Sequence, residues 1–119
     1  MSMSYEESFK LYNEARALVA KGQLEAAVPL FEKSNALYSH FKTLELWGEC
    51  EIKLGNFSRA IAPLVTAIEL NSSIKPKSLL AQAYMKVGQQ NEAIELAKEV
   101  LQTASNNKIA KSILSDKSI

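Results

Sequence analysis

A chain of 119 residues has the length of one domain, and its 14 Lys and Arg residues nearly balance 13 Asp and Glu residues, for a net charge of +1. This balance gives no electrostatic reason to expect nucleic acid or an anionic membrane as a partner. The single cysteine and single histidine exclude a disulfide framework and a cluster of thiolate metal ligands.

The sequence shows no signal peptide, and no apolar run approaches the roughly 18 residues that a membrane-spanning helix requires. We therefore expect a cytoplasmic protein, or a domain of a larger protein, that does not insert into a membrane. Proline and glycine are scarce, whereas Ala, Leu, Glu, Lys and Gln, which lose little rotamer freedom in a helix, are plentiful. This composition predicts an all-α fold.

Helices are expected, in chain order, at about 5–20, 24–37, 41–54, 58–70, 76–87, 92–103 and 107–115. Ser4 and Glu7 form a capping box that would open the first of them. Pro29 and Pro63 lie inside two predicted helices, where proline removes an N–H donor and its ring clashes with the preceding turn. Each of those helices is therefore expected either to start late or to bend.

Three segments of the chain share one pattern: a glycine, an amide residue, three variable positions, an alanine and a β-branched residue. They are Gly22–Val28, Gly55–Ile61 and Gly88–Ile94, and their glycines are 33 residues apart both times. Ser39, Ser72 and Ser105 follow the same spacing. A glycine directly after a helix can adopt a left-handed conformation that ends the helix, and the short turn then sends the next helix back antiparallel. The sequence therefore predicts three helical hairpins.

The first helices of these hairpins carry a second pattern, which reads Leu11-x2-Glu14-Ala15-x2-Leu18, Leu44-x2-Trp47-Gly48-x2-Glu51 and Lys77-x2-Leu80-Ala81-x2-Tyr84. In the second helices, Ala27 precedes Phe31 and Ala60 precedes Leu64 by four residues. The whole resembles the tetratricopeptide repeat, a helical hairpin of about 34 residues. Each repeat here is one residue shorter, and serine replaces the closing proline.

This resemblance implies a single domain over residues 1–119, with repeats at about 5–39, 41–72 and 75–105 and a capping helix at about 107–115. Its fold class would be all-α, a right-handed superhelical stack of antiparallel helix pairs. Such domains bind a peptide segment of another protein in a concave groove, so an adaptor is expected. The groove residues implied here are Phe9, Tyr12, Arg16, Val19, Lys42, Glu45, Glu49, Ile52, Lys53, Lys75, Ser78, Gln82, Met85 and Lys86. Alternatively, Phe9 and Val19 are partly core and the lysines only solvate the surface.

No catalytic constellation, metal-ligand spacing or phosphate-binding loop appears in the sequence, so neither an enzyme nor a cofactor is expected. His40 falls in a turn between repeats and is expected to be exposed. Cys50 is expected to be a core thiol and Trp47 to pack between hairpins.

Some relatives grip the C-terminal carboxylate of heat-shock chaperones with two lysines, two asparagines and an arginine. The matching positions here are Tyr12, Arg16, Leu46, Lys75 and Leu79, of which Lys75 alone fits. One lysine lacks the directed donors of that clamp. A chaperone tail is therefore not an expected partner.

The last predicted helix places Ile109, Ile113 and Leu114 on one face, which suits a cap over the final apolar surface of the array. The same residues motivate an alternative function, a scaffold that assembles end to end, so a monomer or a weak homo-oligomer is expected. Small three-repeat chaperones of secreted proteins are a third possibility by size.

Overall fold

The computed structural model describes residues 2–116, and every regular element in that range is an α-helix. The helices are α1 (Ser2–Ala20), α2 (Leu24–Leu37), α3 (Phe41–Lys53), α4 (Phe57–Leu70), α5 (Ile74–Lys86), α6 (Gln90–Thr103) and α7 (Lys108–Asp116). All of the helices expected from the sequence are confirmed, with ends that differ by at most three residues.

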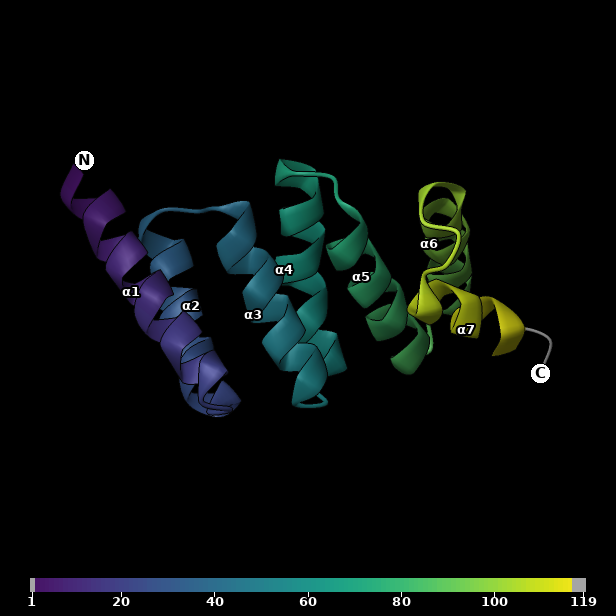
Figure 1. Cartoon of the computed structure of the whole chain (residues 1–119), viewed down its shortest axis with the longest axis horizontal. Helices are drawn as coiled ribbons and strands as arrows, with labels where there is room; N and C mark the ends of the chain where they lie inside the picture. Colours follow the sequence, from purple (N-terminus) through teal and green to yellow (C-terminus); the bar gives the residue numbers. More distant parts are fainter. Residues whose placement is uncertain (1, 117–119) are drawn as a thin grey trace.

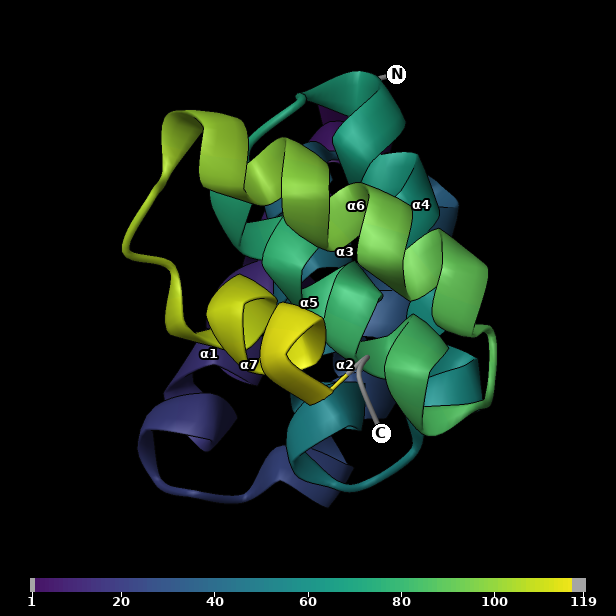
Figure 2. The ribbon, with the colours of Figure 1, turned by 90° about the vertical axis from the view of Figure 1, so that its right-hand side faces the viewer.

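The helices follow one another along the longest of the chain's dimensions, 50 × 25 × 22 Å, with α1 and α7 at opposite ends (Figure 1). They form three pairs, α1 with α2, α3 with α4 and α5 with α6, and each pair packs on the next through α2 against α3 and α4 against α5. The last helix, α7, packs against both α5 and α6 and closes the C-terminal end (Figure 2).

The three glycine turns share one hydrogen-bonded geometry. Gly22, Gly55 and Gly88 have φ values of +78°, +82° and +89°, in the left-handed region that glycine adopts at little cost. In the first turn, the Gln23 N–H donates to the Leu18 carbonyl and the Gly22 N–H to the Val19 carbonyl, both at 2.9 Å. The other two turns repeat these bonds 33 and 66 residues later. The predicted helix-ending role of the glycines is confirmed.

One local expectation needs correction, and one pair of alternatives is narrowed. The first helix already includes Ser2, so Ser4 lies inside its first turn and the predicted capping box is wrong. Of the two alternatives expected at the prolines, a late start is ruled out, because α2 begins at Leu24 and α4 at Phe57 and both continue through Pro29 and Pro63. The carbonyls that lose a donor there belong to Glu25 and Arg59, two exposed residues whose backbone water can reach.

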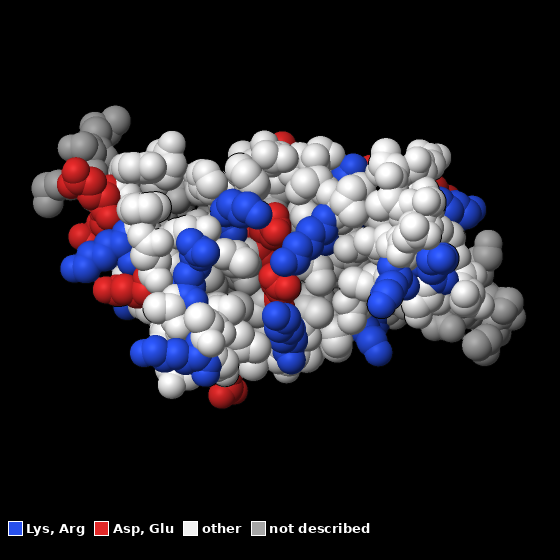
Figure 3. Space-filling view, viewed as in Figure 1, with Lys and Arg blue, Asp and Glu red and all other residues white. Residues whose placement is uncertain are grey.

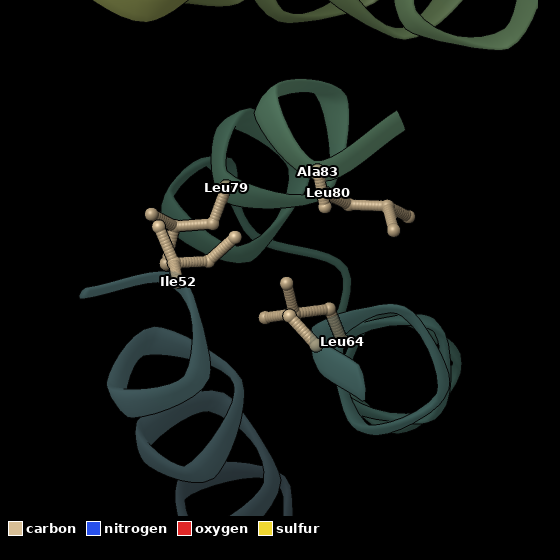
Figure 4. Close-up of a cluster of buried hydrophobic side chains, with 6 residues drawn as sticks. Ile52, Leu64, Leu79, Leu80 and Ala83 are labelled. Carbon is tan, nitrogen blue, oxygen red and sulfur yellow. The ribbon is translucent and has the colours of Figure 1, made fainter. Parts of the chain in front are cut away.

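Apolar clusters cross the boundaries between helix pairs. In the central cluster, Ile52 of α3 and Leu64 of α4 pack with Leu79, Leu80 and Ala83 of α5 (Figure 4). Leu79 lies against Ile52 in that view, whereas Leu80 extends on the side of α4. Each pair therefore covers apolar surface that its neighbour cannot cover alone, as in other repeat proteins.

A reciprocal pair of hydroxyl groups joins α1 to α2. Ser8 Oγ donates to the Ser34 carbonyl and Ser34 Oγ donates to the Ser8 carbonyl, both at 2.8 Å, and both side chains are buried. Because each hydroxyl and each carbonyl has a partner, this polar contact carries no desolvation penalty for an unpaired group.

Helices α3 and α4 cross so closely at Gly48 that no larger residue fits at this position without a shift. A Cβ atom at Gly48 would lie 2.5 Å from Cγ and Cδ2 of Leu64, a side chain with no exposed surface. We expect Gly48→Ala to destabilise the fold by about 1–2 kcal/mol, since overpacking of about 1–3 kcal/mol outweighs a gain of at most about 1 kcal/mol in helix propensity. Urea unfolding followed by circular dichroism measures this.

The companion experiment uses the Leu64→Ala background, where the clash is absent. There, adding Gly48→Ala should raise stability by up to about 1 kcal/mol. If Gly48→Ala stabilises the wild-type chain as well, the contact with Leu64 is not the constraint that excludes a larger residue.

Candidate functional site

The groove residues implied by the sequence lie along α1, α3 and α5, on the side of the array that faces the viewer in Figure 1. We call this surface the first-helix face and define it by its exposed and half-buried members. They are Phe9, Tyr12, Arg16, Val19, Lys42, Glu49, Lys53, Lys75, Gln82, Met85 and Lys86. Figure 3 shows acidic side chains over the middle of this side, flanked by basic ones.

An aromatic ladder occupies the N-terminal end of the first-helix face. The rings of Tyr5, Phe9 and Tyr12 stack in sequence along α1, with 6.4 Å between successive centroids. Tyr38 meets Tyr5 edge-on at 5.0 Å. Phe9 is 54% exposed although it is apolar, and these rings, with His40, border a hollow of about 110 Å³. This end of the face can therefore take an apolar or aromatic side chain.

Charges dominate the middle of the face. Glu49 forms ion pairs with Lys53 at 3.7 Å on its own helix and with Lys75 at 3.1 Å on α5, which ties the second repeat to the third. The Arg16 guanidinium lies 5.6 Å from the centre of the Tyr12 ring and makes no ion pair with any described residue. Arg16, like Lys86, is therefore a basic group of this face that a partner's carboxylate can approach without displacing an ion pair of the described residues.

Three of the implied groove residues face inward. Glu45 is 4% exposed and pairs with Lys42 at 3.7 Å, and Ser78 is 3% exposed and donates from Oγ to the Lys75 carbonyl. Ile52, also implied, belongs to the central core cluster. These three side chains offer almost no surface to a partner, so they support the face from beneath.

The C-terminal end of the face opens into a second hollow, of about 490 Å³, between α5 and α7. Gln82, Met85 and Lys86 border it from α5, and Lys108 and Ser112 from α7. The Lys86 ammonium lies 5.8 Å from the centre of the Phe57 ring, a cation–π contact that holds this lysine close to the surface.

The residues considered as candidates for a chemical function have structural roles instead. His40 is exposed and its Nδ1 accepts the Lys42 N–H at 3.2 Å, so it caps α3, while Trp47 packs on the cluster around Phe31 and donates to Glu51 at 3.4 Å. Both placements agree with the sequence expectations. The described residues contain no group of three potential metal ligands, and none of their helices has the length and apolarity needed to cross a membrane.

Sequence reasoning missed Tyr5 and Tyr38. Tyr5 lies four residues before Phe9 and therefore shares its stripe on α1, so the spacing could have revealed it. Tyr38 lies just beyond the end of α2, and only the folded chain brings it against Tyr5.

Comparisons with known proteins agree with this fold. Residues 77–107 match the sequence profile of the tetratricopeptide repeat, and no curated protein matches the chain. The tetratricopeptide-repeat (TPR) domain of Arabidopsis OM64 superimposes with a TM-score of 0.84 at 18% identity, covering 98% of this chain and 99% of that one.

Two further structures are similar over nearly the whole chain. The first TPR of Spaghetti (RPAP3), bound to the HSP90 peptide SRMEEVD, has a TM-score of 0.84 at 20% identity and covers 96% of this chain and 92% of that one. The second TPR domain of human RPAP3, in complex with the HSP70 peptide SGPTIEEVD, has a TM-score of 0.82 at 20% identity. The match covers 99% of this chain and 98% of that one. The predicted all-α stack of three repeats plus a capping helix is thus confirmed.

Cys50 provides a test of the packing beneath this face. Burial, reinforced by the neighbouring Glu49 carboxylate, raises the pKa of the buried Cys50 thiol to about 11. Because the thiolate is the reacting form, we expect modification by Ellman's reagent at pH 8 to be at least roughly a hundredfold slower than for a free cysteine. Unfolding in urea should restore the ordinary rate, and rapid labelling of the folded chain would contradict the assigned burial.

Proposed function

We propose that this chain, which has the fold of a three-repeat TPR domain closed by a C-terminal helix, is a protein-interaction module that binds a peptide segment of another protein on the first-helix face. The observation that carries the proposal is the exposed aromatic ladder of α1, placed beside an array of mostly basic side chains. Support also comes from the similar structures, two of which hold peptides.

The chemistry of the face indicates what kind of peptide fits. Its charged members, counting the buried Glu45, are five basic groups and two acidic ones: Arg16, Lys42, Lys53, Lys75 and Lys86 against Glu45 and Glu49. An acidic segment with one apolar or aromatic anchor would complement it, with the anchor on the ladder and a carboxylate at Arg16. Lys75 contributes less, because a peptide carboxylate must compete with Glu49 for it.

The alternative of end-to-end self-assembly loses its motivation in the folded chain. Ile109, Ile113 and Leu114 pack into the cluster that α5, α6 and α7 form together, so they cover the last helix pair instead of extending outward. We therefore favour a partner of different sequence over a second copy of this chain, and expect a monomer or a weak homo-oligomer in solution.

Variants of the ladder test the proposal directly. Peptides selected from a displayed random library should be rich in Asp and Glu and carry an aromatic or large apolar residue. Phe9→Ala and Arg16→Ala should each weaken binding of a selected peptide by about tenfold or more, as for anchor residues at other interfaces. Isothermal titration calorimetry measures the affinities.

Arg59→Ala and Lys98→Ala are the matched controls, because both residues are exposed on second helices. They should leave the affinity within about twofold, a difference of about 0.4 kcal/mol. Loss of binding in these controls, with no effect of Phe9→Ala, would show that the first-helix face is not the site.

The face is not expected to grip the C-terminal carboxylate of a chaperone tail. Of the clamp positions, Leu79 is buried in the core, Leu46 packs on the Phe31 cluster and Lys75 is paired with Glu49. The peptide SRMEEVD is acidic and carries apolar residues, so only its terminal carboxylate tests the clamp. Amidation of its C-terminus should change the affinity by less than about twofold. Saturable binding that disappears when its C-terminus is amidated would instead establish a carboxylate clamp.

A further inference from the structure

A hollow of about 860 Å³ lies away from the first-helix face, in an open crevice between α4 and α6 with α5 as its floor. We call it the α4–α6 crevice. Its apolar lining consists of Val65 and Ile68 from α4, Leu80 and Tyr84 from α5, and Leu96 from α6. No residue of the first-helix face borders it.

The 33-residue repeat explains why the hollow exists. One repeat earlier, the position of Leu80 is held by Trp47 and the position of Lys77 by Leu44. Trp47 packs there on the cluster around Phe31, and Leu44 is buried. In the third repeat a smaller side chain replaces the indole and a lysine replaces an apolar residue. The hollow between second helices is accordingly larger here, about 860 Å³ against about 330 Å³ between α2 and α4. Figure 4 shows Leu80 reaching toward the α4 side from α5.

The rim of the crevice is acidic. Lys77 is already neutralised, because its Nζ lies 2.6 Å from Glu99 Oε2 and its side chain is 15% exposed. Glu69, Glu92 and Glu95 also border the crevice, are exposed, and form no ion pair with any described residue. Lys98 is the one further basic residue of the lining. The unneutralised charge is therefore negative around an apolar floor.

We propose that the α4–α6 crevice is a second docking site, which binds an amphipathic helix from a partner protein with an apolar stripe flanked by Lys and Arg. The apolar stripe enters the space that Trp47 fills one repeat earlier, and the basic residues meet Glu69, Glu92 and Glu95. The lining extends along α6 from Asn91 to Gln102, about 16 Å, which matches about three turns of a docked helix. An open trough of this kind suits a helix better than a small ligand, which needs an enclosing pocket.

The probe is a synthetic peptide of leucine and lysine with leucine at helical spacing (i, i+3, i+4, i+7), titrated into the ¹⁵N-labelled chain. Shifts should centre on amides of α4, α5 and α6 that border the crevice, and the affinity should fall as salt is raised. Leu80→Trp, which fills the hollow as Trp47 does in the preceding repeat, should weaken binding at least tenfold.

Glu92→Lys/Glu95→Lys should also weaken binding at least tenfold, and these exposed positions keep the test valid if Leu80→Trp does not fold. Glu6→Lys/Glu14→Lys on α1, an equal charge change at exposed positions, is the matched control and should have less than about a twofold effect. Equal losses in both double variants would reduce the interaction to general charge attraction and overturn the proposal.

Three other outcomes would also overturn it: no binding, shifts centred on α1 and α3, or self-association of the chain that Leu80→Trp abolishes. A Phe9→Ala variant separates this site from the proposed function. It should lose the acidic peptide and keep the leucine–lysine peptide.

Discussion

The close approach of the two helices in each pair is the constraint on which the rest of this structure depends. It is made possible by small residues at repeating positions: Ala15 and Ala27 in the first pair, Gly48 and Ala60 in the second, and Ala81 and Ala93 in the third. The five alanines have no exposed surface, and glycine stands where Leu64 leaves no room for a Cβ. Because the backbones approach so closely, the larger apolar side chains point along the array and reach the next pair.

The chain carries surfaces of opposite character on its first and second helices. Aromatic and mostly basic side chains lie along α1, α3 and α5, whereas the crevice between α4 and α6 has an apolar floor and an acidic rim. A net charge of +1 conceals this segregation, because the two patches nearly cancel in the sum. A module built this way has room for two partners of unlike chemistry, one on each side, without competition for the same residues.

Most of the fold was predictable because the same residue types recur every 33 residues along the sequence. Three glycines, three alanines and three serines at one spacing identify the hairpins, and the glycine turns form as expected. The site was less predictable. Helical spacing assigns a residue to a face but does not show what packs over it, so Glu45 and Ser78 were expected at the surface and are buried. The crevice results from a missing indole volume between two helices, which no single-helix pattern reveals.

The turns within helix pairs and the connections between pairs also differ in how readily they could accept inserted residues. The glycine turns lie on one edge of the array and take three residues each, with a left-handed residue and two backbone hydrogen bonds that permit no extra length (Figure 1). The connections between pairs, 38–40 and 71–73, lie on the opposite edge and contain no left-handed residue. Insertions acquired during evolution should therefore accumulate on that second edge. New loops could then lengthen one margin of the protein while the spacing of its helices stays unchanged.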